Sequence, residues 1–158
     1  RRHKAVSTAE EQPGSEKLTD LKDKYKKRAE QYRTIAKEDL TIGEQRLLGA
    51  LLQKSNYIET HEHLQAVYAL GENYEKCTEY SEKILVLIEE QREERKNYMA
   101  RSDANVSASQ KLRSDLEQLY IKEINCRSIQ ALAYSRLNNP QAAILELNRV
   151  LSIRPDRS

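Results

Sequence analysis

The histidines of this chain are the first residues to consider for metal binding. His61 and His63 are two residues apart in a segment with helical spacing, so they face different directions. They cannot bind one metal ion together as an i, i+4 pair could. Glu59 and His63 do share a helical face, and we interpret them as a salt-bridged or surface-lining pair rather than as half of a zinc site. The sequence therefore predicts no metal site.

The remaining motifs also argue against catalysis. Cys77 and Cys126 have no Cys-x-x-Cys spacing, and two cysteines do not make a disulfide framework, so a reducing compartment is expected. The sequence contains no phosphate-binding glycine loop and no nucleophile elbow. With four glycines in 158 residues, little chain is suited to catalytic loops. We predict that the protein is not an enzyme and has no cofactor.

Composition and charge limit the fold classes and the kinds of partner that can be expected. One third of the residues are charged, 38% are hydrophobic, and only four Gly and three Pro occur, which favours helices over a many-stranded sheet. A formal net charge of +2 gives no reason to expect nucleic acid as the partner. The longest apolar run, Ile84 to Ile88, is too short to span a bilayer. No signal peptide is visible, so we expect a cytoplasmic protein. The chain does not begin with Met, so we expect it to be a fragment.

Apolar residues recur at helical spacing after a polar N-terminal stretch. Residues 1–16 include a Pro-Gly pair and are predicted to form a flexible tail. Thr41 and Glu44 form a capping-box pair, which predicts that a helix starts there. Asn139 before Pro140 predicts another helix start. We expect an all-α fold with six helices in residues 17–158, paired as three antiparallel hairpins at about 17–55, 58–101 and 108–154.

Two of these hairpins resemble each other, and both resemble tetratricopeptide repeats. The pattern alternates small and large side chains where two helices approach closely. In the stretch 124–157 it is carried by Ala131, Tyr134, Ala143, Leu147, Val150, Leu151, Ile153 and Pro155. In the stretch 58–91 it is carried by Tyr68, Tyr74, Cys77, Ser81, Ile84, Leu85 and Leu87. Cys77 stands at a small-residue position, so we interpret it as a packed side chain rather than a reactive thiol.

The spacing of the two repeats is similar to that of the tetratricopeptide domains of large immunophilins and related co-chaperones. In both, an extended second helix and an extended first helix separate the repeats. Arg127 and Gln130 depart from the family pattern, which has larger apolar residues there. The resemblance implies a right-handed superhelix of helical hairpins.

The resemblance also implies a partner-binding groove on the first helix of each repeat. The co-chaperone groove grips an acidic tail with Lys, Arg and Asn, whereas this chain has Glu62, Ala66 and Ile129 at matching places. We therefore expect an apolar or basic segment as the ligand rather than an acidic Hsp90-type tail. By this carry-over the groove residues are Glu59, Glu62, His63, Ala66, Ala69, Leu70, Asn125, Ser128, Ile129, Leu132, Ser135 and Arg136.

Two functions remain open from the sequence. The first is a non-catalytic interaction module, an adaptor or scaffold of co-chaperone-like architecture that binds a protein segment in this groove. The alternative is a structural assembly subunit whose extended helices pair with another chain or copy, making a homo-oligomer. The heptad-like stripe from Leu18 to Ile35 supports the alternative.

Overall fold

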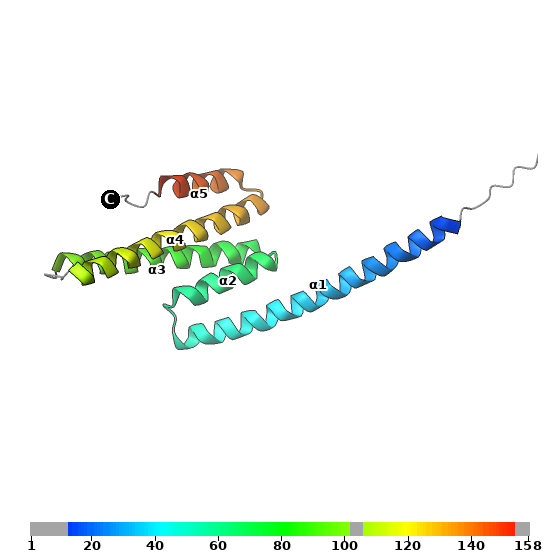
Figure 1. Ribbon diagram of the computed structural model, residues 1–158, viewed down its shortest axis with the longest axis horizontal. Helices are drawn as coiled ribbons and strands as arrows, with labels where there is room; N and C mark the ends of the chain where they lie inside the picture. Colours follow the sequence, from blue (N-terminus) through cyan, green and yellow to red (C-terminus); the bar gives the residue numbers. More distant parts are fainter. Residues whose placement is uncertain (1–12, 102–105, 154–158) are drawn as a thin grey trace, which may run out of the picture. The chain divides into compact units, whose positions relative to one another are not determined.

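The computed structural model describes the backbone of residues 13–101 and 106–153, and it is all-α, as predicted (Figure 1). No strand occurs in these ranges. The helices are α1 (Pro13–Gln53), α2 (Ile58–Leu70), α3 (Tyr74–Arg101), α4 (Val106–Arg136) and α5 (Pro140–Ser152). The chain divides between Asp39 and Leu40 into two compact units, which we describe separately. Most of the predicted tail, residues 1–12, and Pro155 of the predicted repeat pattern lie outside the described residues.

The prediction of two helices within residues 17–55 is wrong, because α1 is one helix of 41 residues. The capping box at Thr41 does not end it, and Gly43 stays helical without a positive φ. Glu44, expected to cap a helix start, instead accepts hydrogen bonds from the Tyr68 hydroxyl at 2.8 Å and the Lys76 ammonium at 3.2 Å. The helix also begins at Pro13, inside the predicted tail, since proline is well suited to a first helical turn.

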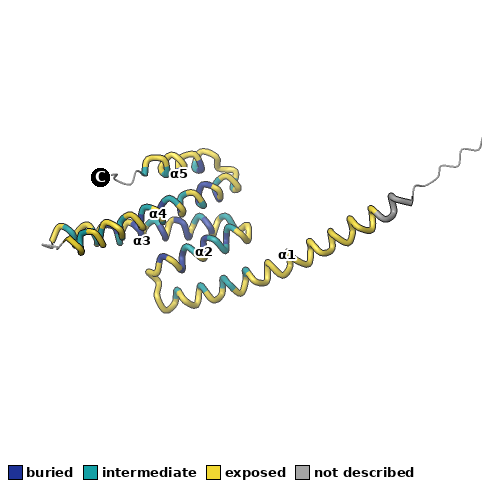
Figure 2. The backbone as a smooth tube through the Cα atoms, viewed as in Figure 1, coloured by how far each residue is buried: buried dark blue, intermediate teal, exposed yellow. Residues whose placement is uncertain are grey.

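Among the described residues, the first unit contains only the N-terminal part of α1. Every side chain from Leu18 to Asp39 is exposed, including the apolar ones (Figure 2). The apolar stripe predicted from Leu18 to Ile35 is therefore present on a helix but is not buried.

The second unit packs α2, α3, α4 and α5 in sequence, each antiparallel to the next (Figure 1). Two clusters form its core. One joins α2, α3 and α4 through Ile58, Ile84, Ile88, Leu119 and Cys126. The other contains Leu64, Tyr68, Cys77, Tyr80 and Ala133, with Leu47 and Leu51 of α1 packed against it.

The turns that follow α2 and α4 have the same geometry. Glu72 and Asn138 adopt left-handed backbone angles, with φ of 59° and 56°. The next residue, Asn73 or Asn139, donates its N–H to a carbonyl five residues back, on Tyr68 or Tyr134, at 2.9 Å in both turns. This is a Schellman motif, which satisfies the last carbonyl groups of a helix.

Each turn then starts the following helix in the same way. The side-chain oxygen of Asn73 accepts the N–H of Lys76, and that of Asn139 accepts the N–H of Ala142, at 3.3 and 3.2 Å. The predicted Asn139 N-cap is confirmed. Corresponding residues in the two turns are 66 positions apart, as are the buried Cys77 and Ala143. We call α2 with α3 the first repeat, and the C-terminal part of α4 with α5 the second repeat.

Candidate functional site

The structure separates the residues that could do metal chemistry. His61 is buried, its Nε2 lies 2.8 Å from the Ser55 carbonyl oxygen, and its ring packs on Tyr80 at 5.7 Å between centroids. His63 is exposed on another side of α2. Among the residues that the structure describes, no three His, Cys, Asp or Glu side chains gather closely enough to hold a metal ion.

The two cysteines are both buried, and neither is in a disulfide. Burial raises the pKa of the Cys77 thiol to about 11 and that of the Cys126 thiol to about 12. A reactive cysteine needs its thiolate, which such pKa values disfavour at neutral pH. Both thiols are therefore placed as small packing groups, and Cys126 Sγ donates to the Ser81 carbonyl at 3.3 Å.

A buried glutamine joins three helices beneath the candidate groove. The side-chain amide of Gln65 on α2 donates to the Ser81 hydroxyl of α3 at 2.6 Å and to the Cys126 carbonyl of α4 at 3.1 Å. The Ser81 hydroxyl in turn donates to the Cys77 carbonyl at 2.7 Å. A buried polar group without a partner is costly, so these bonds favour one relative position of α2, α3 and α4.

This arrangement places α2 and α4 side by side and parallel. Lys122 of α4 lies against Glu62 of α2, and about one helical turn further on Cys126 lies against Gln65. The predicted groove residues of α2 thus lie beside those of α4. We call the surface that these two sets form the α2–α4 face.

Lys122 is part of this face, although the sequence analysis did not select it. Its ammonium lies 2.6 Å from a Glu62 carboxylate oxygen and 3.4 Å from one of Glu59. Burial opposes its charge, but the hydrogen bond and charge of Glu62 outweigh this and raise the pKa of Lys122. The predicted acidic end of the groove is therefore reduced to one excess negative charge from these three residues.

The apolar part of the face is partly used by the core. Ile129 and Ala69 are half-buried and pack against the cluster that contains Tyr68. Leu70 and Leu132 are 72% and 49% exposed, so they remain available to a partner. Ala66 is half-buried, and the polar members His63, Asn125, Ser128, Ser135 and Arg136 are exposed.

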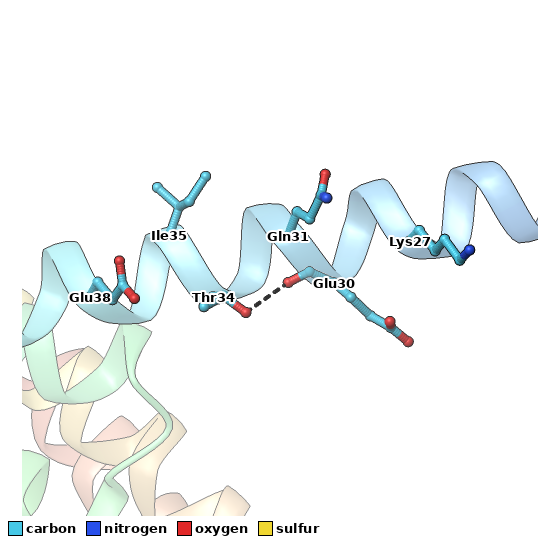
Figure 3. Close-up of a pocket in the computed structure, with 6 residues that line it drawn as sticks. All are labelled: Lys27, Glu30, Gln31, Thr34, Ile35 and Glu38. Atoms are coloured by element: carbon cyan, nitrogen blue, oxygen red, sulfur yellow. Dashed lines mark hydrogen bonds between the residues drawn. The ribbon is translucent and has the colours of Figure 1, made fainter.

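Three of the hollows in the described part of the chain lie elsewhere. One lies along α1, where all six lining residues come from that helix, so no second element closes it (Figure 3). In that view the Thr34 hydroxyl donates to the Glu30 carbonyl, at 3.1 Å. The other two lie on α3, one beside Asn56 and the other beside Ser55 and His61. None of the three contains a predicted groove residue.

A chain of charges, most of them buried or half-buried, joins α3, α4 and α5. Glu123 of α4 pairs with Arg92 of α3 and, at 2.9 Å, with Arg127 of its own helix. Arg127 then reaches Glu146 of α5 at 2.7 Å, and Glu146 also accepts from Arg149 at 2.6 Å. The only feature of the sequence that could have indicated these ion pairs was Arg127, which stands at a position where tetratricopeptide repeats have an apolar residue.

These charges shift the ionisation of Glu123. Burial alone would raise its pKa, but the hydrogen bonds and charges of Arg92 and Arg127 outweigh burial and hold the pKa below its ordinary value. Glu123 is therefore ionised at neutral pH.

Comparison with known proteins gives no further assignment. No protein-family model, no curated protein and no solved structure matches the chain. None of the described helices is long and apolar enough to cross a membrane. The candidate site must therefore be judged from the internal repeat and the α2–α4 face themselves.

Proposed function

We propose that this chain is a non-catalytic protein–protein interaction module, a tetratricopeptide-like adaptor or scaffold that works in the cytoplasm. A segment of a partner protein binds on the α2–α4 face. The observation that carries the proposal is the set of hydrogen bonds made by the buried Gln65. These bonds favour a parallel arrangement of α2 and α4, in which the two helices share one surface. On that surface Leu70 and Leu132 are exposed although they lie beside a well-packed core.

The charges on the face favour particular ligands. Glu59, Glu62 and Lys122 together keep one negative charge at one end, and Arg136 lies at the C-terminal end of α4. An apolar segment with a basic residue toward Glu59 complements this pattern, whereas an acidic tail meets repulsion at that end. We therefore propose an apolar or basic segment as the ligand, and we expect its apolar contacts to supply most of its affinity.

The test uses a double substitution on the face and a matched one elsewhere. Leu70→Asp with Leu132→Asp places two charges on the face without cutting into the core. Leu145→Asp with Leu151→Asp makes the same change on α5, where the two leucines are 50% and 77% exposed. Proteins cross-linked to the wild-type chain in cells are identified, and the bound segment of each is then made as a peptide and titrated against all three chains.

We expect the Leu70 and Leu132 variant to bind such a peptide at least about tenfold more weakly, a loss of about 1.4 kcal/mol, and the α5 variant to bind it normally. Equal binding by all three chains would reject the α2–α4 face as the site. Tight binding of an acidic C-terminal chaperone peptide at this face would reject the proposed ligand preference.

A further inference from the structure

The N-terminal part of α1 has an apolar stripe that is exposed along its whole length. Leu18 and Leu21 are 55% and 48% exposed, and Tyr25, Tyr32 and Ile35 are 65%, 71% and 53% exposed. Spacings of three, four and seven residues place all five on one side of the helix. Helices in proteins gain most of their stability by packing such a face against something else. The stripe therefore needs a partner.

The stripe has the heptad period of a coiled coil. With Leu18 taken as position a, Tyr25 and Tyr32 also fall at a, and Leu21, Ile35 and Ile42 fall at d. Ile42, on the same helix, is 47% exposed. The residues of α1 that contact the core cluster, Leu47 and Leu51, fall at b and f instead. Within the C-terminal part of α1, the residues that contact the core thus lie at positions other than a and d.

Two charged residues interrupt the stripe, and they have opposite signs. Arg28 falls at a d position and Asp39 at an a position, and both are exposed. A charge in a coiled-coil seam is costly unless an opposite charge faces it, so such residues select which helices pair and in which direction. A partner helix for this stripe must present an acidic residue to Arg28 and a basic residue to Asp39.

A second copy of the same helix meets this requirement in one direction only. In a parallel pair aligned in register, Arg28 would face the other Arg28 and Asp39 the other Asp39, and both layers would repel. In an antiparallel pair a positions face d positions, and a single register sets Arg28 against the second copy's Asp39. That register also sets Tyr32 against the other Ile35 and Tyr25 against the other Ile42.

The flank of the stripe is suited to close approach. Between Tyr25 and Gly43 the e positions hold Ala29, Ala36 and Gly43, all small, and in the antiparallel register Ala29 of one copy faces Ala36 of the other. A Cβ atom built on Gly43 would meet nothing within 4 Å, so space is open beside it. Small side chains at regular spacing let two helix backbones come closer together and increase their van der Waals contact.

We propose that the stripe from Tyr25 to Ile42 is a self-association surface, on which a second copy of this chain pairs antiparallel with Arg28 of each copy against Asp39 of the other. None of its residues belongs to the α2–α4 face, so the proposal does not depend on the proposed function. It gives the module two copies of its binding face, which can engage two ligand segments at once.

The test is a charge exchange followed by sedimentation equilibrium of the full chain across micromolar concentrations. Arg28→Glu alone sets Glu against Asp, and Asp39→Arg alone sets Arg against Arg. We expect each single variant to dimerise at least about tenfold more weakly than the wild type. The double variant, Arg28→Glu with Asp39→Arg, restores both opposite-charge layers and therefore dimerises again.

Matched controls make the same charge changes away from the stripe. Lys26→Glu and Asp23→Arg lie at positions b and f, and we expect both to dimerise as the wild type does. Circular dichroism confirms that all variants keep their helices. A wild-type chain that stays monomeric, or a dimer that Arg28→Glu and Asp39→Arg leave unchanged, overturns the proposal. A double variant that pairs with the wild type instead of with itself would show parallel pairing and overturn it as well.

Discussion

The first and second repeats have the same turn and the same helix start, but different side chains fill the space between their two helices. In the first repeat His61 and Tyr80 pack ring against ring. In the second, the residues 66 positions later are Arg127 and Glu146, which form an ion pair at 2.7 Å. Tyr80 and Glu146 are buried to nearly the same extent, 8% and 5% exposed.

This difference shows what sets the geometry of a repeat. Two aromatic rings and an ion pair have little in common chemically, yet they occupy corresponding positions. What the repeats do share is the Schellman turn, the Asn N-cap and a small residue, Cys77 or Ala143, at the helix contact. The backbone hydrogen bonds and the small residue therefore position the two helices, and the facing pair adapts to what lies around it.

The largest expected effect comes from breaking the ion pair on one side. Glu146→Ala removes the α5 partner of Arg127 and leaves a largely buried guanidinium with Glu123 alone. Breaking a buried pair in this way costs about 3–5 kcal/mol, and because Glu123 remains as a partner we expect a loss of about 3 kcal/mol. Chemical denaturation followed by circular dichroism measures this loss.

A double substitution tests whether the facing pairs of the two repeats are interchangeable. Arg127→His with Glu146→Tyr copies the pair of the first repeat into the second. We expect it to recover most of the stability lost in Glu146→Ala, because replacing both members of a buried ion pair is often close to neutral. If the double variant is less stable than Glu146→Ala, then the charge chain itself, and not the shared backbone, determines the packing of the second repeat.

The sequence identified the parts of the fold that depend on local interactions. Asn139 before Pro140, and the small residues Cys77 and Ala143, are recognisable within a few residues of chain. The capping box at Thr41 and Glu44 looked equally local but was wrong, because a cap is worth only about 1 kcal/mol and Glu44 is used instead by Tyr68 and Lys76.

The parts that were missed depend on contacts between distant segments. Glu123 and Glu146 look like ordinary charges of a solvent-exposed helix face, and only the packing of three helices shows that they are buried. Lys122 entered the candidate site for the same reason, since its partners Glu59 and Glu62 are 63 and 60 residues away in the sequence. Helical periodicity cannot show which face of α4 meets α2.

The charge chain should also make the second repeat sensitive to acid. The pKa of Glu123 is lowered in the folded chain, so this carboxylate stabilises the fold above its unfolded pKa, near 4.5, and the stabilisation is lost as the pH falls through the lower folded value. We expect the free energy of unfolding to fall in this acidic range. Urea denaturation at several pH values measures it.

Glu123→Gln supplies the control for this pH dependence. The amide cannot ionise, so the variant is less stable at neutral pH but loses less stability on acidification than the wild type. The aromatic pair of the first repeat contains no carboxylate, so Tyr80→Phe should leave the acid dependence unchanged. Identical acid profiles for Glu123→Gln and the wild type would show that other carboxylates dominate.

A small difference in stability should distinguish the two turns, which are otherwise alike. Glu72 and Asn138 both have left-handed backbone angles, which cost an ordinary side chain about 1–2 kcal/mol, whereas asparagine tolerates them better and glycine adopts them freely. Glu72→Gly should therefore stabilise the chain by about 0.5–1 kcal/mol, after allowing for the greater entropy of glycine in the unfolded chain. Asn138→Gly should change stability by less than this. Thermal unfolding of both variants tests the order, and a larger gain from Asn138→Gly would mean that the two turns are strained differently despite their matching hydrogen bonds.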